Sequence, residues 1–271
     1  MLTRFAPSPT GLLHLGHACA AFHAWDEAKQ GRGTFLLRIE DLDTGRCREH
    51  FEQAIFEDLH WLGFAWPEPV LRQSERMSVY AAALEKLDRL GVIYPCFCSR
   101  QEIALSAPHG PSGAIYSGTC RSLTSEERAA RIVAGQSHAF RLHAEKASRL
   151  AGPLTWIDLG RGIVKAQPRE LGDVVLARKD TPASYHLAVT VDDAAQQITV
   201  VTRGEDLFPS THIHRLVQAL LGLPVPVWRH HRLICDSSGK RMAKRHDACS
   251  LRALRERGVS PESVRQMLEE T

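Results

Sequence analysis

Apolar and polar residues follow two different periods along the chain, and the order of these periods predicts an α/β fold. Short apolar runs alternate with longer stretches in which apolar residues recur at helical spacing, and glycine or proline closes most segments. The predicted strands are residues 2–6, 34–39 and 198–202, and the predicted helices are residues 16–30, 46–62, 75–90 and 210–221. Strands that alternate with helices in this way favour a parallel sheet.

The middle of the chain departs from this alternation. Capping boxes at Ser99–Glu102 and Thr124–Glu127 predict two helix starts. Short β-like runs follow at residues 138–143, 154–159 and 162–166. We therefore predict an α/β domain split between residues 1–95 and 182–245, an insertion at 96–181 and a short helical tail at 246–271.

Composition limits the class of protein. The chain has 271 residues, of which 44% are hydrophobic and 24% charged, which excludes a disordered or fibrous protein. The most apolar stretch, residues 216–228, contains two prolines and is shorter than the roughly 20 residues that a membrane helix needs, so we predict no membrane association. The N-terminus has no apolar signal segment, and seven cysteines are an odd number. We expect a cytoplasmic protein with reduced thiols or a metal site.

The net charge of +3 is too small to indicate nucleic-acid binding, but the charges are unevenly distributed. Residues 229–257 hold nine Lys or Arg against three acids, and residues 40–58 hold seven acids against two Arg. A charge run is usually a solvated face, and this is our interpretation of the acidic stretch.

A motif with catalytic potential lies between the first strand and the first helix. It runs from Ala6 to His17 and ends in His14-Leu15-Gly16-His17. A strand–turn–helix directs backbone N–H groups and the positive end of the helix at an anion, and two histidines can donate hydrogen bonds to phosphate oxygens. Taken alone, two histidines near a helix start are more often structural or surface residues.

A second motif, Asp236 to Arg245, is a turn followed by four cations in six residues. Such a loop could close on the β- and γ-phosphates of ATP and stabilise leaving pyrophosphate. The alternative is a solvated basic loop.

Three cysteines form the third candidate. Cys96, Cys98 and Cys120 lie in an insertion too small for a rich core, which is compatible with structural Zn²⁺. Spacing alone favours zinc and buried free thiols equally. His109 is the ordinary chemical choice for a fourth ligand. We expect the remaining cysteines to be packing residues: Cys19, Cys47, Cys235 and Cys249.

Taken together, the first two motifs resemble the two signatures of class I aminoacyl-tRNA synthetases. The sequences of three segments are similar to those of the glutamyl/glutaminyl branch: Arg4–Gly11, Leu37–Asp43 and Arg203–Leu207. The resemblance covers most of residues 1–245. It implies a Rossmann-like α/β catalytic domain with a parallel sheet, interrupted by a zinc-containing α+β insertion, and a reaction that uses ATP with Mg²⁺.

The resemblance also implies site residues. The glutamate site would comprise Arg4, Ala6, Ser8, Glu40, Tyr185 and Arg203. The ATP site would comprise Pro7, His14, Gly16, His17, Arg241, Met242, Ala243, Lys244 and Arg245, with His14, His17 and Lys244 catalytic. The zinc ligands would be Cys96, Cys98, Tyr116 and Cys120. The chemistry agrees, since arginine can grip a carboxylate and Glu40 can pair with an ammonium. Ala243 departs from the family, which has serine there.

Only 26 residues follow Arg245, where a full glutamyl-tRNA synthetase continues through an anticodon-binding domain. The shortened form resembles the glutamyl-Q tRNA(Asp) synthetases. The expected reaction is activation of L-glutamate by ATP and its transfer to the queuosine base in the anticodon of tRNA(Asp), by a monomer without that domain. The alternatives are a compact synthetase that charges the terminal adenosine, a non-catalytic tRNA- or nucleotide-binding paralogue and a small-molecule nucleotidyltransferase.

Overall fold

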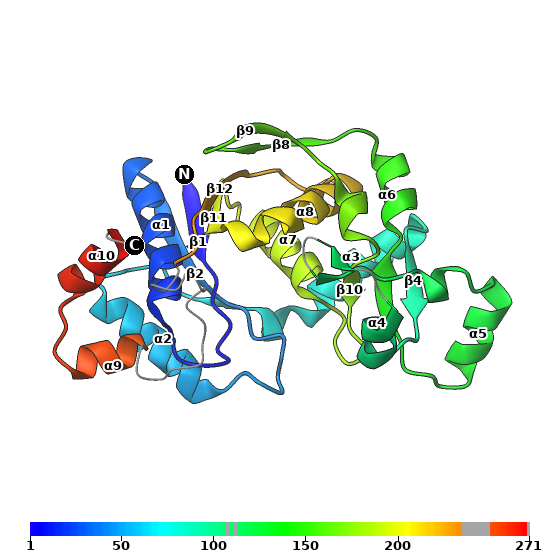
Figure 1. Cartoon of the computed structure of the whole chain (residues 1–271), viewed down its shortest axis with the longest axis horizontal. Coiled ribbons are helices and arrows are strands. Elements are labelled where there is room, and N and C mark those ends of the chain that lie inside the picture. Colours follow the sequence, from blue (N-terminus) through cyan, green and yellow to red (C-terminus); the bar gives the residue numbers. More distant parts are fainter. Residues whose placement is uncertain (107–108, 111–112, 235–249, 270–271) are drawn as a thin grey trace. The chain divides into compact units, whose positions relative to one another are not determined.

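The computed structural model describes residues 1–106, 109–110, 113–234 and 250–269, and it divides into two compact units (Figure 1). The first unit comprises Met1–Glu75, Ile198–Glu205 and Pro226–Thr271. The second comprises Arg76–Gln197 and Asp206–Val225. Each unit is thus assembled from segments that are far apart in the sequence.

Parallel strands form the centre of the first unit. Strands β1 (Leu2–Phe5), β2 (Thr34–Ile39) and β3 (Leu71–Arg72) are parallel and lie in that order. Strands β11 (Val200–Gly204) and β12 (Val227–His231) are also parallel. Just before β11, the N–H of Thr199 donates to the carbonyl of Leu2 at 2.9 Å, so that β11 lies beside β1. The predicted parallel sheet is confirmed.

Helix α1 (Leu15–Gln30) packs against β1, β2 and β11. Its contact face consists of small residues at helical spacing, each at most 2% exposed: Ala18, Ala21, Ala24 and Ala28. Because alanine has only a methyl group, the helix axis can approach the strands closely. The hydroxyl of Thr3 on β1 donates to the carbonyl of Ala24 at 2.8 Å, a contact that a larger residue on this face would obstruct.

The C-terminal tail folds onto the same unit. Helix α9 (Leu251–Glu256) contacts α2 (Glu49–Trp61), and α10 (Pro261–Glu269) contacts α1. The N–H of Leu251 donates to the carbonyl of Leu13 at 2.8 Å, which ties the tail to the turn before α1. The predicted helical tail thus consists of two short helices, and the second begins at Pro261, a position where proline is favoured.

The second unit contains an antiparallel sheet in the order β10 (Val175–Ala177), β7 (Ala139–Leu142) and β4 (Ile93–Cys96). Sequence analysis did not assign β4, whose third residue is Pro95. Proline cannot donate to a ladder, and it is tolerated here because β4 is an edge strand of this sheet. The predicted β-like runs at 154–159 and 162–166 form the antiparallel pair β8 (Thr155–Asp158) and β9 (Gly162–Lys165).

Helices complete the second unit. Helices α3 (Met77–Arg89), α7 (Tyr185–Ala195) and α8 (Phe208–Leu221) contact one another, and α6 (Ala144–Ala151) contacts α8. Asp192 on α7 is fully buried and accepts hydrogen bonds from Tyr80 and Arg76, both at 2.7 Å. The remaining elements are α4 (Arg100–Ser106), the strand pair β5 (His109–Gly110) and β6 (Gly113–Ala114), and α5 (Ser125–Val133).

The compact units do not divide at the predicted domain limits, because α3 and α7, which flank the predicted insertion 96–181, belong to the same unit as the insertion. The predicted limits stay predictions.

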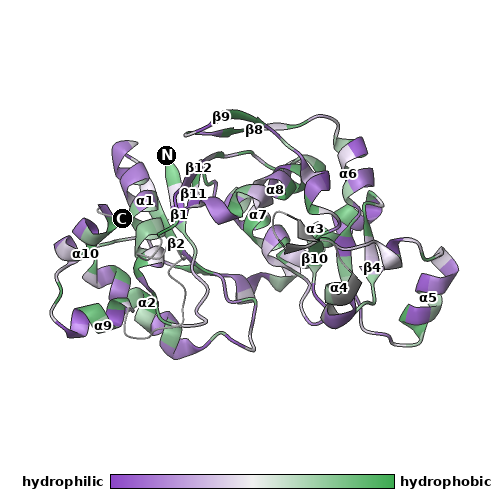
Figure 2. Cartoon of the chain, viewed as in Figure 1, coloured by the Kyte–Doolittle hydropathy of each residue, from purple (hydrophilic) through white to green (hydrophobic). Residues whose placement is uncertain are grey.

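In the part of the chain that the structure describes, no helix combines the length and apolarity that crossing a bilayer requires. Figure 2 shows the reason, since hydrophilic residues alternate with hydrophobic ones along helices such as α1 and α6.

A buried carboxyl group lies where α2 meets α9. The side chain of Asp58 is fully buried, and neither of its oxygens accepts a hydrogen bond from a described residue. Among the described residues, the nearest cation is Arg255, whose Nη2 lies 3.7 Å from Asp58 Oδ1. Burial, only partly offset by Arg255 and Arg252, raises the pKa of Asp58 from 3.8 to about 6.

Asp58→Asn should therefore stabilise the protein at neutral pH. The unfolded chain releases the proton near pH 3.8 and the folded chain near pH 6, so wild-type stability falls between these values and the penalty persists above them. We expect the variant to gain on the order of 2 kcal/mol at pH 7.5 and little at pH 3.5, measured by urea unfolding. Equal gains at both pH values would contradict this prediction.

Candidate functional site

The two histidines of the first motif cap their own helix. His14 is the N-cap of α1, and its Nδ1 accepts a hydrogen bond from the N–H of Gly16 at 3.1 Å. The Nδ1 of His17 accepts one from the N–H of His14 at 3.2 Å. The ring centroids are 3.9 Å apart. Together they form a capping box built from imidazoles in place of the usual hydroxyl and carboxylate.

This cap fixes where each ring carries its proton. A neutral imidazole has one acceptor and one donor nitrogen, so rings that accept at Nδ1 donate from Nε2. Both histidines of the motif thus present an N–H donor at the start of a helix, where an anion is favoured. A Cβ at Gly16 would lie 2.9 Å from Cε1 of His14, so the glycine makes room for the capping ring.

Predicted glutamate-site residues lie near the ends of the parallel strands. Arg4 on β1 and Arg203 on β11 are each 5% exposed. Arg4 donates to the carbonyl of Thr202 at 3.2 Å, and Arg203 donates to Nε2 of His230 at 3.3 Å. Buried guanidinium groups on adjacent strands can bind an anion in a water-poor setting, where charged hydrogen bonds are strongest.

Glu40 follows β2 and is held from two sides. Its N–H donates to the carbonyl of Pro7 at 3.0 Å, and its Oε1 lies 3.3 Å from Nη2 of the fully buried Arg38. The Pro7 contact ties Glu40 to the segment that carries Ala6 and Ser8. The first unit thus brings together five of the six predicted glutamate-site residues on the loops that follow β1 and β2 and on strands β1 and β11.

The sixth residue, Tyr185, begins α7 in the second unit. Its ring contacts His186 and His214, with centroids 5.6 and 5.5 Å away.

The predicted ATP loop, with Arg241, Met242, Ala243, Lys244 and Arg245, lies outside the described residues. Its predicted role is therefore considered only as a proposal below.

The four predicted zinc residues lie together. The sulfur atoms of Cys96, Cys98 and Cys120 are all within 4.8 Å of one another, and Cys98 Sγ is 3.5 Å from Cys120 Sγ. Cys98 Sγ is also 3.4 Å from the hydroxyl oxygen of Tyr116. Sulfur ligands around tetrahedral zinc are roughly 3.8 Å apart, given Zn–S bonds of about 2.3 Å, so the donors fit this ion. His109 falls on β5.

The surroundings of these thiols favour ionisation of Cys120 over that of Cys98. Burial opposes ionisation of Cys120, but hydrogen bonds from Tyr116 and from the N–H of Phe97 outweigh it and lower the pKa of Cys120 to about 7. Burial raises the pKa of Cys98 to about 11. Arg141 on β7 donates to Cys96 Sγ at 3.2 Å and lies 4.0 Å from the centre of the Tyr116 ring. A cation thus lies against the cluster.

Asp173 supports this cluster, and sequence analysis did not identify its role. It is 3% exposed, and its carboxylate accepts hydrogen bonds from Tyr94 at 2.6 Å, Arg121 at 2.9 Å and the N–H of Ala144 at 2.9 Å. Its carbonyl accepts from Arg141 at 2.7 Å. Asp173 therefore joins β4, β7 and the segment around Cys120.

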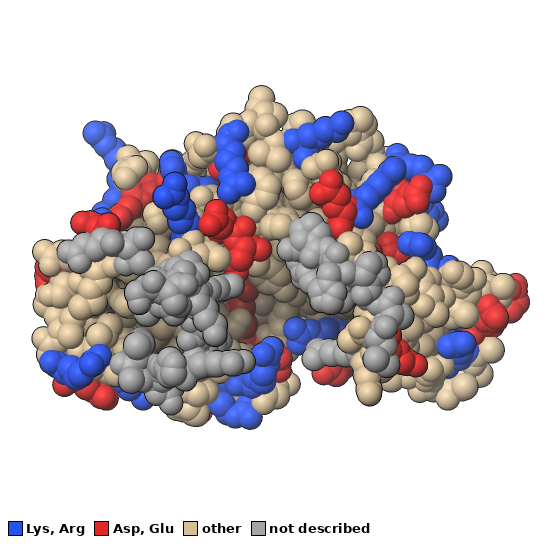
Figure 3. All heavy atoms as spheres, in the orientation of Figure 1, with Lys and Arg blue, Asp and Glu red and all other residues tan. Residues whose placement is uncertain are grey.

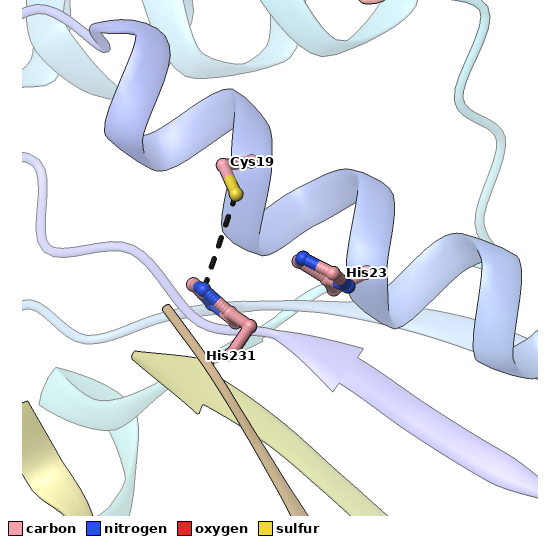
Figure 4. Close-up of side chains that lie close together, drawn as sticks. All are labelled: Cys19, His23 and His231. Carbon is pink, nitrogen blue, oxygen red and sulfur yellow. Dashed lines mark hydrogen bonds between the residues drawn. The ribbon is translucent and has the colours of Figure 1, made fainter. Parts of the chain in front are cut away.

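Sequence analysis also missed a second group of metal-ligand type, in the first unit. Figure 4 shows Cys19 and His23 on α1 directed toward His231 at the end of β12. Cys19 Sγ lies 3.9 Å from Nδ1 of His231, so Cys19 has a polar partner and is more than the packing residue that we expected. The spacing of Cys19 and His23 is a signal for a shared helix face, whereas nothing local links them to His231.

The fold and these residues correspond to the catalytic domain of a class I aminoacyl-tRNA synthetase. A family model described as "tRNA synthetases class I (E and Q), catalytic domain" matches residues 1–270. The chain belongs to this family, and it is a ligase of the aminoacyl-tRNA synthetase type.

Individual relatives within this family are named for glutamate. The chain is 48% identical to the glutamyl-Q tRNA(Asp) synthetase of Rhodobacter capsulatus, over 99% of both chains. It is 40% identical to the glutamate–tRNA ligase of Aquifex aeolicus, over 97% of this chain and 55% of the relative. A crystal structure of a glutamate tRNA ligase from Elizabethkingia meningosepticum, in complex with its amino acid, matches with a TM-score of 0.74 and 30% identity, over 92% of this chain and 52% of that one. This chain spans about half the length of these two ligases.

Asp173→Asn should destabilise the protein. The amide keeps one acceptor, but it removes the charge that Arg121 contacts and adds an N–H where donors already converge. We expect the free energy of unfolding to fall by about 3 kcal/mol in urea titrations. The exposed Asp180 in the same unit is the matched control, and Asp180→Asn should change stability by less than about 0.5 kcal/mol. Equal stability of the two variants would refute the supporting role of Asp173.

Proposed function

We propose that this protein activates L-glutamate with ATP and transfers it to the queuosine base in the anticodon of tRNA(Asp). The observation that carries the proposal is the 48% identity to a glutamyl-Q tRNA(Asp) synthetase over 99% of both chains. Two further relatives with this name are 42% and 43% identical and are covered over 83% and 82% of their length.

Buried charges support glutamate as the substrate. A guanidinium fork from Arg4 or Arg203 would hold a substrate carboxylate, and the carboxylate of Glu40 would pair with the substrate ammonium. In the first unit these three side chains extend from β1, β11 and the end of β2. Tyr185 would add a hydroxyl contact. Cations and an anion are thus available for both ends of an amino acid.

The first step would be adenylate formation. A glutamate α-carboxylate oxygen attacks the α-phosphorus of ATP, which enters as its magnesium complex, and pyrophosphate leaves. The Nε2–H donors of His14 and His17 would stabilise the charge that develops on phosphate oxygens. Lys244, with Arg241 and Arg245, would hold the leaving pyrophosphate. Such catalysis requires positioning and charge stabilisation rather than covalent participation of the protein.

The second step would be transfer to RNA. A hydroxyl of the queuosine cyclopentene ring attacks the carbonyl carbon of the adenylate, the hydroxyl proton is lost, and AMP leaves. The predicted insertion 96–181 would contact the anticodon loop of the tRNA. This insertion has a pocket of about 600 Å³ whose lining includes Arg149, Lys165 and Arg169. Figure 3 shows Lys and Arg side chains over β8, β9 and α6, with acidic side chains among them. This substrate and the reduced thiols favour a cytoplasmic location, and a monomer is sufficient for the reaction.

The test is transfer of labelled glutamate, with ATP and Mg²⁺, to tRNA from cells that make queuosine and from cells that do not. We expect label only on queuosine-containing tRNA, and nuclease mapping should locate it in the anticodon loop. Label on the terminal adenosine of both preparations would instead indicate a compact charging enzyme. Absence of label would leave a non-catalytic protein or a small-molecule nucleotidyltransferase, which pyrophosphate exchange separates.

Variants link the reaction to the site. Glu40→Gln should reduce transfer by roughly 10- to 100-fold, since a charged hydrogen bond to the substrate is lost. The exposed acid Glu49 on α2 provides the control, and Glu49→Gln should be active. Lys244→Ala should abolish pyrophosphate exchange, and near-normal exchange would exclude its proposed role.

We further propose that Cys96, Cys98 and Cys120 hold a structural Zn²⁺ with Tyr116, and the variants can decide between Tyr116 and His109. Cys98→Ala and Tyr116→Phe should each lower the zinc retained after dialysis and the melting temperature, because metal binding is coupled to folding. Cys47→Ala removes a thiol from the first unit and should keep full zinc content. Zinc loss in His109→Ala together with normal zinc in Tyr116→Phe would assign the fourth ligand to the histidine.

A further inference from the structure

We propose that Cys19, His23 and His231 form a second metal site, in the first unit, for a borderline or soft cation such as Zn²⁺ (Figure 4). It is separate from the Cys96, Cys98 and Cys120 cluster, which lies in the second unit.

The geometry matches a chelate. One donor atom from each residue lies within 4.8 Å of the other two, and Cys19 Sγ is 3.9 Å from Nδ1 of His231. Sulfur and nitrogen ligands of tetrahedral zinc are roughly 3.5 Å apart, given bonds of about 2.3 and 2.0 Å. The Nδ1 of His231 also lies 2.9 Å from the carbonyl oxygen of Arg232, so an ion bound through this nitrogen would displace that contact.

Packing restrains Cys19 and His231, whereas the side chain of His23 can turn. Cys19 is 9% exposed and His231 is 8% exposed, so packing restrains both. His23 is exposed and stacks on His231, with the ring centroids 4.5 Å apart and the planes inclined by 13°. Both rings cannot direct nitrogen lone pairs at one ion while they are stacked, so the exposed His23 ring would have to turn.

The donor set defines the class of ligand. Two imidazoles and a thiol suit Zn²⁺, Co²⁺ or copper, and they are poor ligands for Mg²⁺, which prefers oxygen. Because His23 faces solvent, the fourth position of a tetrahedral ion would be open to water. We therefore expect an exchangeable site rather than the closed site of a structural zinc.

The three residues lie on two different elements of the first unit. Cys19 and His23 lie one and two turns into α1, whose N-cap is His14, and His231 is the last residue of β12, which precedes residues 235–249. An ion on these three ligands would link α1 to the end of β12.

Cobalt provides the test, because a thiolate bound to Co²⁺ gives a near-ultraviolet charge-transfer band and tetrahedral Co²⁺ gives visible bands. The full-length protein is loaded with one equivalent of Zn²⁺ and then titrated with Co²⁺. His23→Ala should weaken the affinity for Co²⁺ more than about tenfold. In Cys19→Ala the thiolate charge-transfer band of the bound cobalt should be absent. Bound cobalt should also raise the melting temperature of the parent protein, and this rise should be absent from both variants.

Matched controls separate this site from other thiols and imidazoles. Cys47→Ala removes another cysteine of the first unit, and His60→Ala removes another exposed histidine, and both should bind cobalt like the parent. His23 is exposed, so its replacement leaves the core intact even if Cys19→Ala fails to fold. Unchanged cobalt spectra in His23→Ala would overturn the proposal and would leave Cys19 and His231 as packing partners.

Discussion

Burial of guanidinium groups beside the parallel strands is the constraint on which the rest of the first unit depends. Arg38 is fully buried, and Arg4 and Arg203 are nearly so. Removing a cation from water is costly unless hydrogen bonds and opposite charge compensate. Arg38 has the Glu40 carboxylate, Arg4 has a backbone carbonyl, and Arg203 has the ring of His230. These contacts pre-orient the charges, so a zwitterionic amino acid would meet groups that already have fixed positions.

In the second unit, the buried charges are instead organised around an acid. Asp173 accepts hydrogen bonds from a phenol, two guanidinium groups and a backbone N–H, and Arg141 extends that network to Cys96 and the Tyr116 ring. The thiols are therefore held by contacts that do not require an ion, and the Arg141 cation lies against them. A metal would then add to an existing arrangement, as expected where donors converge before binding.

Sequence predicted what is local and missed what is long-range. Alternating periods predicted α1, the parallel strands and the tail helices, because each depends on spacing within a few residues. The contact of Cys19 with His231 joins residues 212 positions apart, so no pattern near either residue could reveal it. Strand β4 was missed for another reason, since the proline within it is compatible only with an edge position, which depends on the whole sheet.

Helix α1 shows how one segment can serve three roles without conflict. The histidine pair occupies its first turn, alanines at a spacing of three and four contact the sheet, and Cys19 with His23 forms a separate stripe. A helix separates these sets by angle, so each can change with little effect on the others. The exception is Gly16, where any side chain would meet the capping ring of His14. The cap therefore constrains the His14-to-His17 motif more tightly than either histidine does alone, because the hydrogen bonds accepted at Nδ1 fix the tautomer of both rings.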